Sequence, residues 1–289
     1  MTDVAERAPE PSLPRLRWWK EVAFGLAVYF IYSVVRNRFG SAGGDPGPAF
    51  GHARDIIHIE RALHLYIEPH LQRWYLDLPG NGLIRGWNVY YGLAHFLVTF
   101  GALVWLFRSN PARYPLWRNT LAITTCLAVV GFAAYSLMPP RLLDDPGEYG
   151  GCQIYAPDAA ATAEPGDLTA PGCDRYGYVD TVARYGGWIS FGNDGYKDVS
   201  NQYAAMPSMH IGWSTWSALV LVPLLRRRRA KVLAALYPFI TLACIMVTAN
   251  HYWLDGLGGL LCLSVGFGVA RIVTNRTAGR AKVPVIPTT

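Results

Sequence analysis

Several long apolar stretches, most of them free of Lys and Arg, constrain this sequence more than any other feature. A helix needs roughly 20 apolar residues to cross the hydrocarbon core of a bilayer. Only 16% of the 289 residues are charged, against about 25% in soluble proteins. The sequence therefore predicts an all-α, polytopic membrane protein with six transmembrane helices. These are expected near residues 19–35, 86–107, 119–138, 207–225, 232–250 and 253–273.

The first of these stretches also has the start of a secretory signal peptide, because Arg15, Arg17 and Lys20 precede its apolar run. The run ends in residues 34–38 (VVRNR), which contain no small-x-small cleavage pattern. We therefore expect a retained transmembrane helix at this position.

The distribution of basic residues predicts the orientation of the helices. With the N-terminus in the cytoplasm, the short inside segments carry sixteen of the 26 Lys and Arg residues. The second outer loop, residues 139–206, carries ten acidic and four basic residues. The positive-inside rule therefore predicts that both termini lie in the cytoplasm. We expect a multi-pass protein of the plasma membrane. No nucleic-acid partner is expected, because the basic run at 226–229 is typical of a cytoplasmic loop.

One membrane domain is expected, spanning residues 18–273. Residues 1–17 and 274–289 are predicted to be disordered cytoplasmic tails. In the first outer loop, residues 55–76 place apolar side chains near helical spacing, which indicates an interfacial helix or a lid packed on the spans. The polar residues expected on its outer side are Arg54, Glu60, Arg61 and Arg73.

Two of the five cysteines, Cys152 and Cys173, share the second outer loop. In an oxidising compartment they would form a disulfide, and otherwise they would be two unpaired surface thiols. The other three lie within predicted spans, where a thiol acts as a small apolar residue: Cys126, Cys244 and Cys262.

Three segments that are distant in the sequence are predicted to meet at the outer face of the membrane. They are residues 138–141 (MPPR), 205–210 (AMPSMH) and 250–255 (NHYWLD). Polar and ionisable residues at the ends of spans are costly to hold in a bilayer unless they serve a function. Their convergence on one face therefore predicts the position of a site.

The residue types in these segments suit phosphoryl transfer. His251 and Asp255 are four residues apart, so on a helix the carboxylate can orient the imidazole and leave one ring nitrogen as a nucleophile. His210 would then act as the general acid and base. Arg141 and Ser208 would bind the phosphate, with backbone N–H groups at the start of the fourth span.

Other interpretations of the same residues stay open. His210, His251 and Asp255 could hold zinc, although an adjacent arginine suits an anion better than a cation. Each histidine alone could be an ordinary interfacial residue. A transporter could use the same polar groups to bind and release an anion, but transporters tend to place their sites at the bilayer midplane within internal repeats, and no repeat is visible in this chain.

The segments AMPSMH and NHYWLDG resemble the second and third motifs of the type 2 phosphatidic acid phosphatase (PAP2) superfamily. The turn at 139–141, the run 201–210 and residues 88–95 resemble the branch that includes inositol phosphorylceramide synthases. The resemblance covers about residues 50–270. It implies that His251 forms a phospho-histidine, oriented by Asp255, with His210 as acid and base, Arg141 and Ser208 as phosphate ligands, and no metal or other cofactor.

The chain departs from the superfamily pattern in two places. Cys244 and Ile245 stand where the third motif usually has Ser-Arg, and the first motif is reduced to Pro-Pro-Arg. A phosphate pocket with fewer cations gives Arg141 a larger role. In the second span, His95 forms a polar stripe with Asn88 and Tyr91, which fits a buried histidine satisfied by neighbouring helices or a substrate-binding residue.

The sequence thus predicts a membrane enzyme that transfers a phosphoryl group from a lipid phosphate or phospholipid head group at the extracytoplasmic face. With water as the acceptor it would be a lipid phosphatase, and with a polyol or lipid hydroxyl it would be a phosphotransferase. The chemistry up to the phospho-histidine is the same in both.

Overall fold

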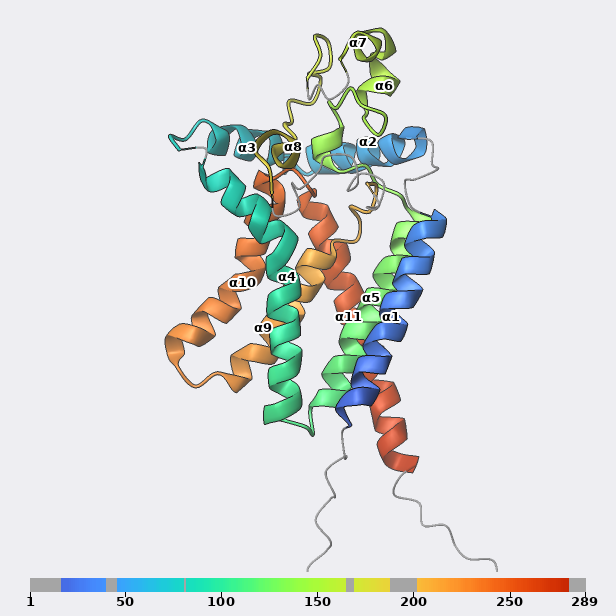
Figure 1. Ribbon diagram of the computed structural model, residues 1–289, viewed down its shortest axis with the longest axis vertical. Coiled ribbons are helices and arrows are strands. Elements are labelled where there is room, and N and C mark those ends of the chain that lie inside the picture. Colours follow the sequence, from blue (N-terminus) through green and yellow to red (C-terminus); the bar gives the residue numbers. More distant parts are fainter. Residues whose placement is uncertain (1–16, 40–45, 81, 165–168, 188–201, 281–289) are drawn as a thin grey trace, which may run out of the picture.

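Helices are the regular secondary structure of the part that the structure describes, apart from one isolated β-bridge between Leu137 and Ala204. This computed structural model describes residues 17–39, 46–80, 82–164, 169–187 and 202–280. Figure 1 shows a bundle of long helices with a layer of short helices and loops across one end. The predicted all-α architecture is confirmed for these residues.

A helix occupies each of the six positions at which a span was predicted. These helices are α1 (Trp18–Phe39), α4 (Gly82–Ser109), α5 (Tyr114–Ala134), α9 (Met209–Leu224), α10 (Arg228–Val247) and α11 (Trp253–Arg280). Within the described residues, α4, α5, α10 and α11 are long and apolar enough to cross a membrane. Two of the six helices fall outside that group: α9, which has 16 residues, and α1, which has charged residues in its first turn.

Successive long helices run in alternating directions (Figure 1). The start of α1 and the end of α11 lie at the same end of the bundle, opposite the layer of short helices, and α9 and α11 both begin beneath that layer. α11 continues to Arg280, into the predicted tail 274–289. Residues 281–289, and all but the last residue of the predicted tail 1–17, lie outside the described residues.

The outward faces of the long helices are apolar. Phe100 on α4, Phe239 on α10 and Leu261 on α11 are 71%, 69% and 65% exposed. Apolar surface of this extent is unfavourable in water and is satisfied by contact with lipid acyl chains. Together with the apolar helices, it identifies a multi-pass membrane protein.

The interior of the bundle is packed around two tryptophans where α5, α9 and α11 meet. Trp216 is fully buried, and its indole N–H donates to the carbonyl oxygen of Trp117 at 2.9 Å. This bond satisfies the polar atom of a large side chain that otherwise contributes apolar area. α11 also approaches α5 closely at Gly266, where a Cβ would press against Thr124.

The predicted helix at 55–76 is two helices, not one. α2 (Pro46–Ala62) begins before the predicted start, and α3 (Glu68–Leu76) follows a break at which His64 has a φ of 58°. A left-handed residue interrupts the right-handed helical path, so the chain changes direction there.

The expectation that Glu60 lies on the outer polar side is wrong. Glu60, Glu68 and Gln72 are all fully buried. They point inward because α2 and α3 lie over the ends of α10 and α11, where Gln72 donates to the carbonyl oxygen of Val247 at 3.2 Å.

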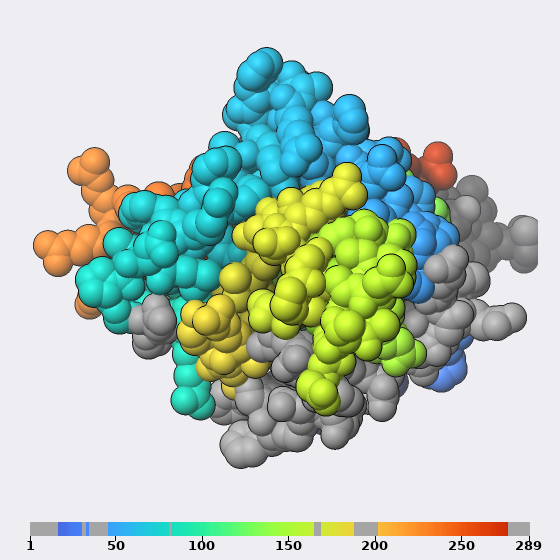
Figure 2. Space-filling view, turned by 90° about the horizontal axis from the view of Figure 1, so that it is seen from above, coloured from blue at the N-terminus to red at the C-terminus, as the bar shows by residue number. Residues whose placement is uncertain are grey.

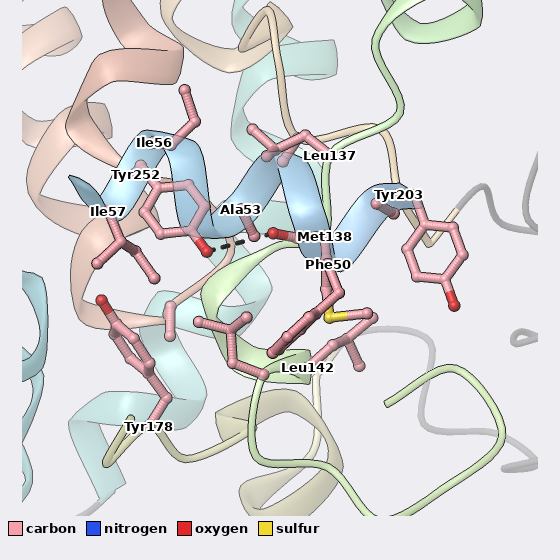
Figure 3. Close-up of a cluster of buried hydrophobic side chains, with 14 residues drawn as sticks. Phe50, Ala53, Ile56, Ile57, Leu137, Met138, Leu142, Tyr178, Tyr203 and Tyr252 are labelled. Atoms are coloured by element: carbon pink, nitrogen blue, oxygen red, sulfur yellow. Dashed lines mark hydrogen bonds between the residues drawn. The ribbon is translucent and has the colours of Figure 1, made fainter. Parts of the chain in front are cut away.

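An apolar cluster joins α2 to the segments beneath it (Figure 3). Phe50 and Ile57 of α2 pack with Met138, Leu142 and Tyr252, all of them buried. The hydroxyl of Tyr252 donates to the carbonyl oxygen of Met138 at 3.3 Å. The residue that follows His251 is thereby fixed to the end of the segment that leads from α5 into the outer loop.

The outer loop contains short helices: η2 (Pro140–Leu142), α6 (Cys152–Tyr155), α7 (Pro157–Ala161) and α8 (Thr181–Tyr185). Seen from above, its described segments 140–163 and 169–187 lie against α2 and α3 and cover much of this face (Figure 2).

Two features organise the described part of this loop. The carboxylate of Asp144 accepts hydrogen bonds from the backbone N–H groups of Tyr176, Gly177 and Tyr178 at 2.6 to 3.2 Å. A disulfide links Cys152 to Cys173, with Cα atoms 5.4 Å apart. Both features link the first half of the loop to the second. The described part of the loop therefore has a defined structure of its own and is more than a connector.

Candidate active site

Main-chain hydrogen bonds hold the three motif segments together. The N–H of Arg141 donates to the carbonyl oxygen of Ala249 at 2.8 Å, and the N–H of Ser208 donates to that of Asp255 at 2.8 Å. The turn that carries His251 follows α10, where Ala249 has a φ of 52°. The segments after α5, before α9 and before α11 therefore meet at one end of the bundle.

His251 is held at two places on one side of its ring. Its Nδ1 lies 3.2 Å from Oδ2 of Asp255 and 2.8 Å from the carbonyl oxygen of Ala205. The same Oδ2 accepts from the N–H of Tyr252 at 3.0 Å. Because both neighbours of Nδ1 are acceptors, Nδ1 carries the proton and Nε2 carries the lone pair.

His210 faces His251 from the first turn of α9. Its Nδ1 lies 3.3 Å from Nε2 of His251, and its Nε2 lies 3.2 Å from the carbonyl oxygen of Tyr91. The ring also stacks on the ring of Tyr91, with centroids 4.3 Å apart. The carbonyl acceptor assigns a proton to Nε2, so a hydrogen bond between the two histidines requires a second proton on Nδ1 of His210.

The main chain of Arg141 contacts the turn that carries His251, but its side chain is bound within the outer loop. Its Nη1 donates to Oδ2 of Asp180 at 2.7 Å, and its Nη2 donates to Oε1 of Gln202 at 2.7 Å. Asp180 also caps α8 by accepting from the N–H of Ala183 at 2.9 Å. The predicted phosphate ligand is therefore fixed by two loop residues that the sequence did not indicate.

Ser208 is fully buried at the N-cap of α9, and no described residue hydrogen-bonds its Oγ. The sequence suggested that backbone N–H groups here form an anion cradle. The N–H of Ser208 is not part of one, because it donates to the carbonyl oxygen of Asp255. A Cβ at Gly259 would collide with the carbonyl oxygen of Ser208. The absence of a side chain at Gly259 lets the main chains of α9 and α11 touch beside the histidines.

The polar stripe on α4 contributes to the same region. His95 is 8% exposed, its Nδ1 lies 3.1 Å from the carbonyl oxygen of Tyr91, and its ring centroid is 4.2 Å from that of His210. Asn88 instead binds the outer loop, donating to the carbonyl oxygens of Thr181 and Gly186 at 2.8 Å. Within this stripe, His95 thus packs against His210, and Asn88 binds the outer loop.

The positions that depart from the superfamily pattern are part of the core. Cys244 and Ile245 are fully buried, and the thiol of Cys244 donates to the carbonyl oxygen of Trp87 at 3.4 Å. Neither supplies a charge. In the described part of the chain, no three His, Cys, Asp or Glu side chains converge as metal ligands.

An apolar pocket of about 540 Å³ lies between α9, α10 and α11. Its walls include Ile211, Trp253 and Gly256, which follow the site residues closely in sequence, and Phe239 and Leu257 further along the helices. A cavity of this size and lining suits hydrocarbon rather than a polar group.

Comparison with known proteins agrees with the motifs. The chain is similar to the inositol phosphorylceramide synthase catalytic subunit aur1 of Schizosaccharomyces pombe (strain 972 / ATCC 24843), with 26% identity over 186 residues. The alignment covers 63% of this chain and 38% of that protein, so the chain spans well under half of its relative. No solved structure matches the chain. The model of the PAP2 superfamily matches residues 54–269, which include all three motif segments, and the protein belongs to the PAP2 superfamily.

Proposed function

We propose that this protein is an integral-membrane lipid phosphatase or phosphotransferase that works through a phospho-histidine on His251. The observation that carries the proposal is the alignment of Asp255, His251 and His210, in which the carboxylate binds Nδ1 of His251 and Nε2 faces the second histidine. This is the arrangement of an oriented nucleophile beside a general acid.

In the first step, Nε2 of His251 attacks the phosphorus of the substrate. A P–N bond forms, the P–O bond to the leaving group breaks, and Nδ1–H of His210 protonates the departing oxygen. The positive charge that develops on the His251 ring is stabilised by Asp255, through the hydrogen bond at Nδ1.

In the second step, a hydroxyl group attacks the phospho-histidine. Nδ1 of His210, now without its proton, takes the proton of the acceptor as the P–N bond breaks, which restores both imidazoles. Water as the acceptor releases phosphate. A polyol or lipid hydroxyl as the acceptor yields a new phosphodiester or phosphomonoester.

Arg141 and Ser208 are proposed to bind the phosphoryl oxygens. Arg141 presents a guanidinium at the point where the outer loop begins, and its fork geometry matches a phosphate as well as it matches the carboxylate of Asp180. The hydroxyl of Ser208 lies at the N-terminus of α9, where the helix dipole favours an anion. The proposed mechanism uses only these side chains and requires no metal ion.

Three considerations support a lipid substrate at the extracytoplasmic face. The multi-pass architecture places the site at the end of the bundle opposite the described termini, and the positive-inside rule assigns those termini to the cytoplasm. The name of the yeast relative includes a lipid product, inositol phosphorylceramide. The apolar pocket between α9, α10 and α11 can accept an acyl chain. We further propose that all six long helices cross the plasma membrane.

Phosphoryl transfer by detergent-purified protein in EDTA tests the proposal. The substrates are phosphatidic acid and phosphatidylinositol, each with and without inositol or ceramide as the acceptor, and the variant is His251→Ala. Activity that His251→Ala abolishes supports the histidine mechanism, and a new phospholipid made with an acceptor identifies a transferase. Equal activity in the variant overturns the nucleophile assignment. No turnover in either protein, combined with binding of the lipid, indicates a transporter.

A further inference from the structure

The side chain of the residue before α11 does not cap the first N–H groups of that helix. A helix begins with backbone N–H groups that lack partners within the helix, and these groups are usually capped by Ser, Thr, Asp or Asn. The residue before α11 is Tyr252, whose hydroxyl binds Met138 instead. The cap is supplied from outside: Oε1 of Glu68 accepts from the N–H of Trp253 at 3.0 Å, and Oε1 of Glu60 accepts from that of Leu254 at 3.4 Å.

The two glutamates come from different helices, Glu60 from α2 and Glu68 from α3, and both are fully buried. Their second oxygens, the Oε2 atoms, are also buried, and no other described residue donates to either of them. The two carboxyl groups lie close enough for each to act on the ionisation of the other. Two carboxylates in contact repel and cannot both be ionised in a buried site, whereas one shared proton turns the contact into a hydrogen bond.

The charges around the pair favour retention of that proton. Burial, together with the negative charges of Glu68 and Asp255, raises the pKa of Glu60 to about 9, and burial likewise raises the pKa of Glu68. The cation Arg61 of α2 lies over Tyr66, with its guanidinium 4.9 Å from the centroid of that ring. The tyrosines beside the pair do not titrate in the same range, because burial raises the pKa of Tyr66 to about 12 and that of Tyr178 further above its usual value.

The capped residues lie inside the catalytic turn. Trp253 and Leu254 stand between His251 and Asp255, and Tyr252 donates its N–H to the same Asp255 oxygen that binds His251. If the backbone at 253 and 254 shifts, the 3.2 Å contact between His251 and Asp255 shifts with it. The two glutamates thus hold the geometry of the nucleophile without touching the substrate.

We propose that Glu60 and Glu68 are positioning residues for the reaction, which share one proton and act as a two-carboxyl cap on the turn from His251 to Asp255. This inference rests on the proposed function of that turn. The pair is an acid and its conjugate base: Glu60 donates the shared proton to Glu68, and both accept from α11.

A rescue experiment tests the proposal with the full-length protein and phosphatidic acid in mixed micelles. Glu60→Ala removes a cap and is expected to lower kcat about tenfold or more with little change in KM. Glu60→Gln keeps an oxygen for the N–H of Leu254 and an N–H donor for Glu68, so it is expected to restore most of the lost kcat. The matched control is Glu148→Gln, because Glu148 is an exposed carboxylate of the same outer region.

The pH profile separates positioning from a merely structural role. Wild-type kcat is expected to fall as the pH rises through about 9, where the shared proton is lost and the two carboxylates repel. Glu60→Gln has no such proton, so its alkaline limb is expected to extend to higher pH, while that of Glu148→Gln matches the wild type. A wild-type alkaline limb in Glu60→Gln, or no rescue relative to Glu60→Ala, overturns the proposal.

Thermal unfolding tests the shared proton with a measurement that does not depend on enzymatic activity. A carboxyl group with a raised pKa contributes stability that is complete below its unfolded pKa and is lost as the pH rises toward the folded pKa. The melting temperature of Glu60→Gln relative to wild type should therefore rise between about pH 5 and about pH 9, by at least about 2 °C. If no lipid substrate is turned over, the proposed function fails while this comparison still tests the cap, and a constant difference across this range overturns it.

Discussion

Nε2 of His251 lies 3.3 Å from Nδ1 of His210, and the outer nitrogen of each ring points at a carbonyl oxygen. The carbonyls favour one proton on each outer nitrogen, so a hydrogen bond between the two inner nitrogens needs one further proton. In the proposed mechanism the phosphoryl group takes the lone pair of His251, and that proton stays on His210. The proposal thus assigns nucleophilic attack to one imidazole and proton transfer to the other.

The division predicts that the need for His210 depends on the leaving group. In His210→Ala, turnover of phosphatidic acid is expected to fall about 10²- to 10⁴-fold, because an alkoxide must be protonated as it leaves. An aryl phosphate releases a stable phenolate and needs no acid in the first step. A stopped-flow burst of nitrophenol, followed by an accumulated phosphoenzyme, is therefore expected for His210→Ala with nitrophenyl phosphate. His251→Ala should give no burst, and a burst there would contradict the assignment.

Asp255→Asn is expected to lower kcat about 10²-fold or more, since an amide oxygen still accepts from Nδ1 of His251 but no longer offsets the charge on the phospho-histidine. The measurement is single-turnover formation of the phosphoenzyme. Asp158→Asn, at an exposed site of the outer loop, is the matched control. Wild-type rates for Asp255→Asn would show that the carboxylate is structural only.

The ion pair between Arg141 and Asp180 predicts competition between a carboxylate and a phosphate for one guanidinium. Arg141→Lys loses the bidentate fork and should weaken inhibition by vanadate about tenfold. Asp180→Asn keeps a polar neighbour without the charge and should strengthen inhibition. If neither variant changes the inhibition constant, Arg141 does not bind the phosphoryl group.

The disulfide predicts the compartment of the outer loop and part of its stability. Each single variant, Cys152→Ser or Cys173→Ser, and the double variant should lower the free energy of unfolding by the same amount, about 2–4 kcal/mol. The reason is that all three break the same crosslink, which joins residues 21 positions apart. The free energy of unfolding in urea measures the loss. In intact cells, a maleimide that cannot cross membranes should label this pair only after reduction, and labelling that requires permeabilised cells would place the loop inside.

The sequence predicted those parts of the molecule whose signal is local. The long helices follow from runs of apolar residues, and His251 with Asp255 follows from a spacing of four within one segment. Convergence of the three segments followed from helix direction alone, because alternate spans return the chain to the same face.

Features that depend on distant partners could not be predicted in this way. Glu60 was grouped with the charged residues on the polar side of the predicted helix, yet its partner is the N–H of Leu254, far along the chain. The available signal was indirect: Tyr252, the residue before α11, is not one of the usual N-cap residues. The partners of Arg141 lie in an irregular loop, where no periodicity indicates contacts, and the break at His64 depends on a single backbone angle.

At Gly259 the main chain of α11 lies directly against the carbonyl oxygen of Ser208, the N-cap residue of α9. Contact between two main chains leaves no adjustable side chain in between, so the backbone itself sets the spacing between α9, which carries His210, and α11, which follows the turn of His251. The residues that surround a head group can then diverge during evolution while the catalytic spacing stays constant. One histidine pair can in this way serve enzymes that differ in the lipid they select and in the acceptor they admit.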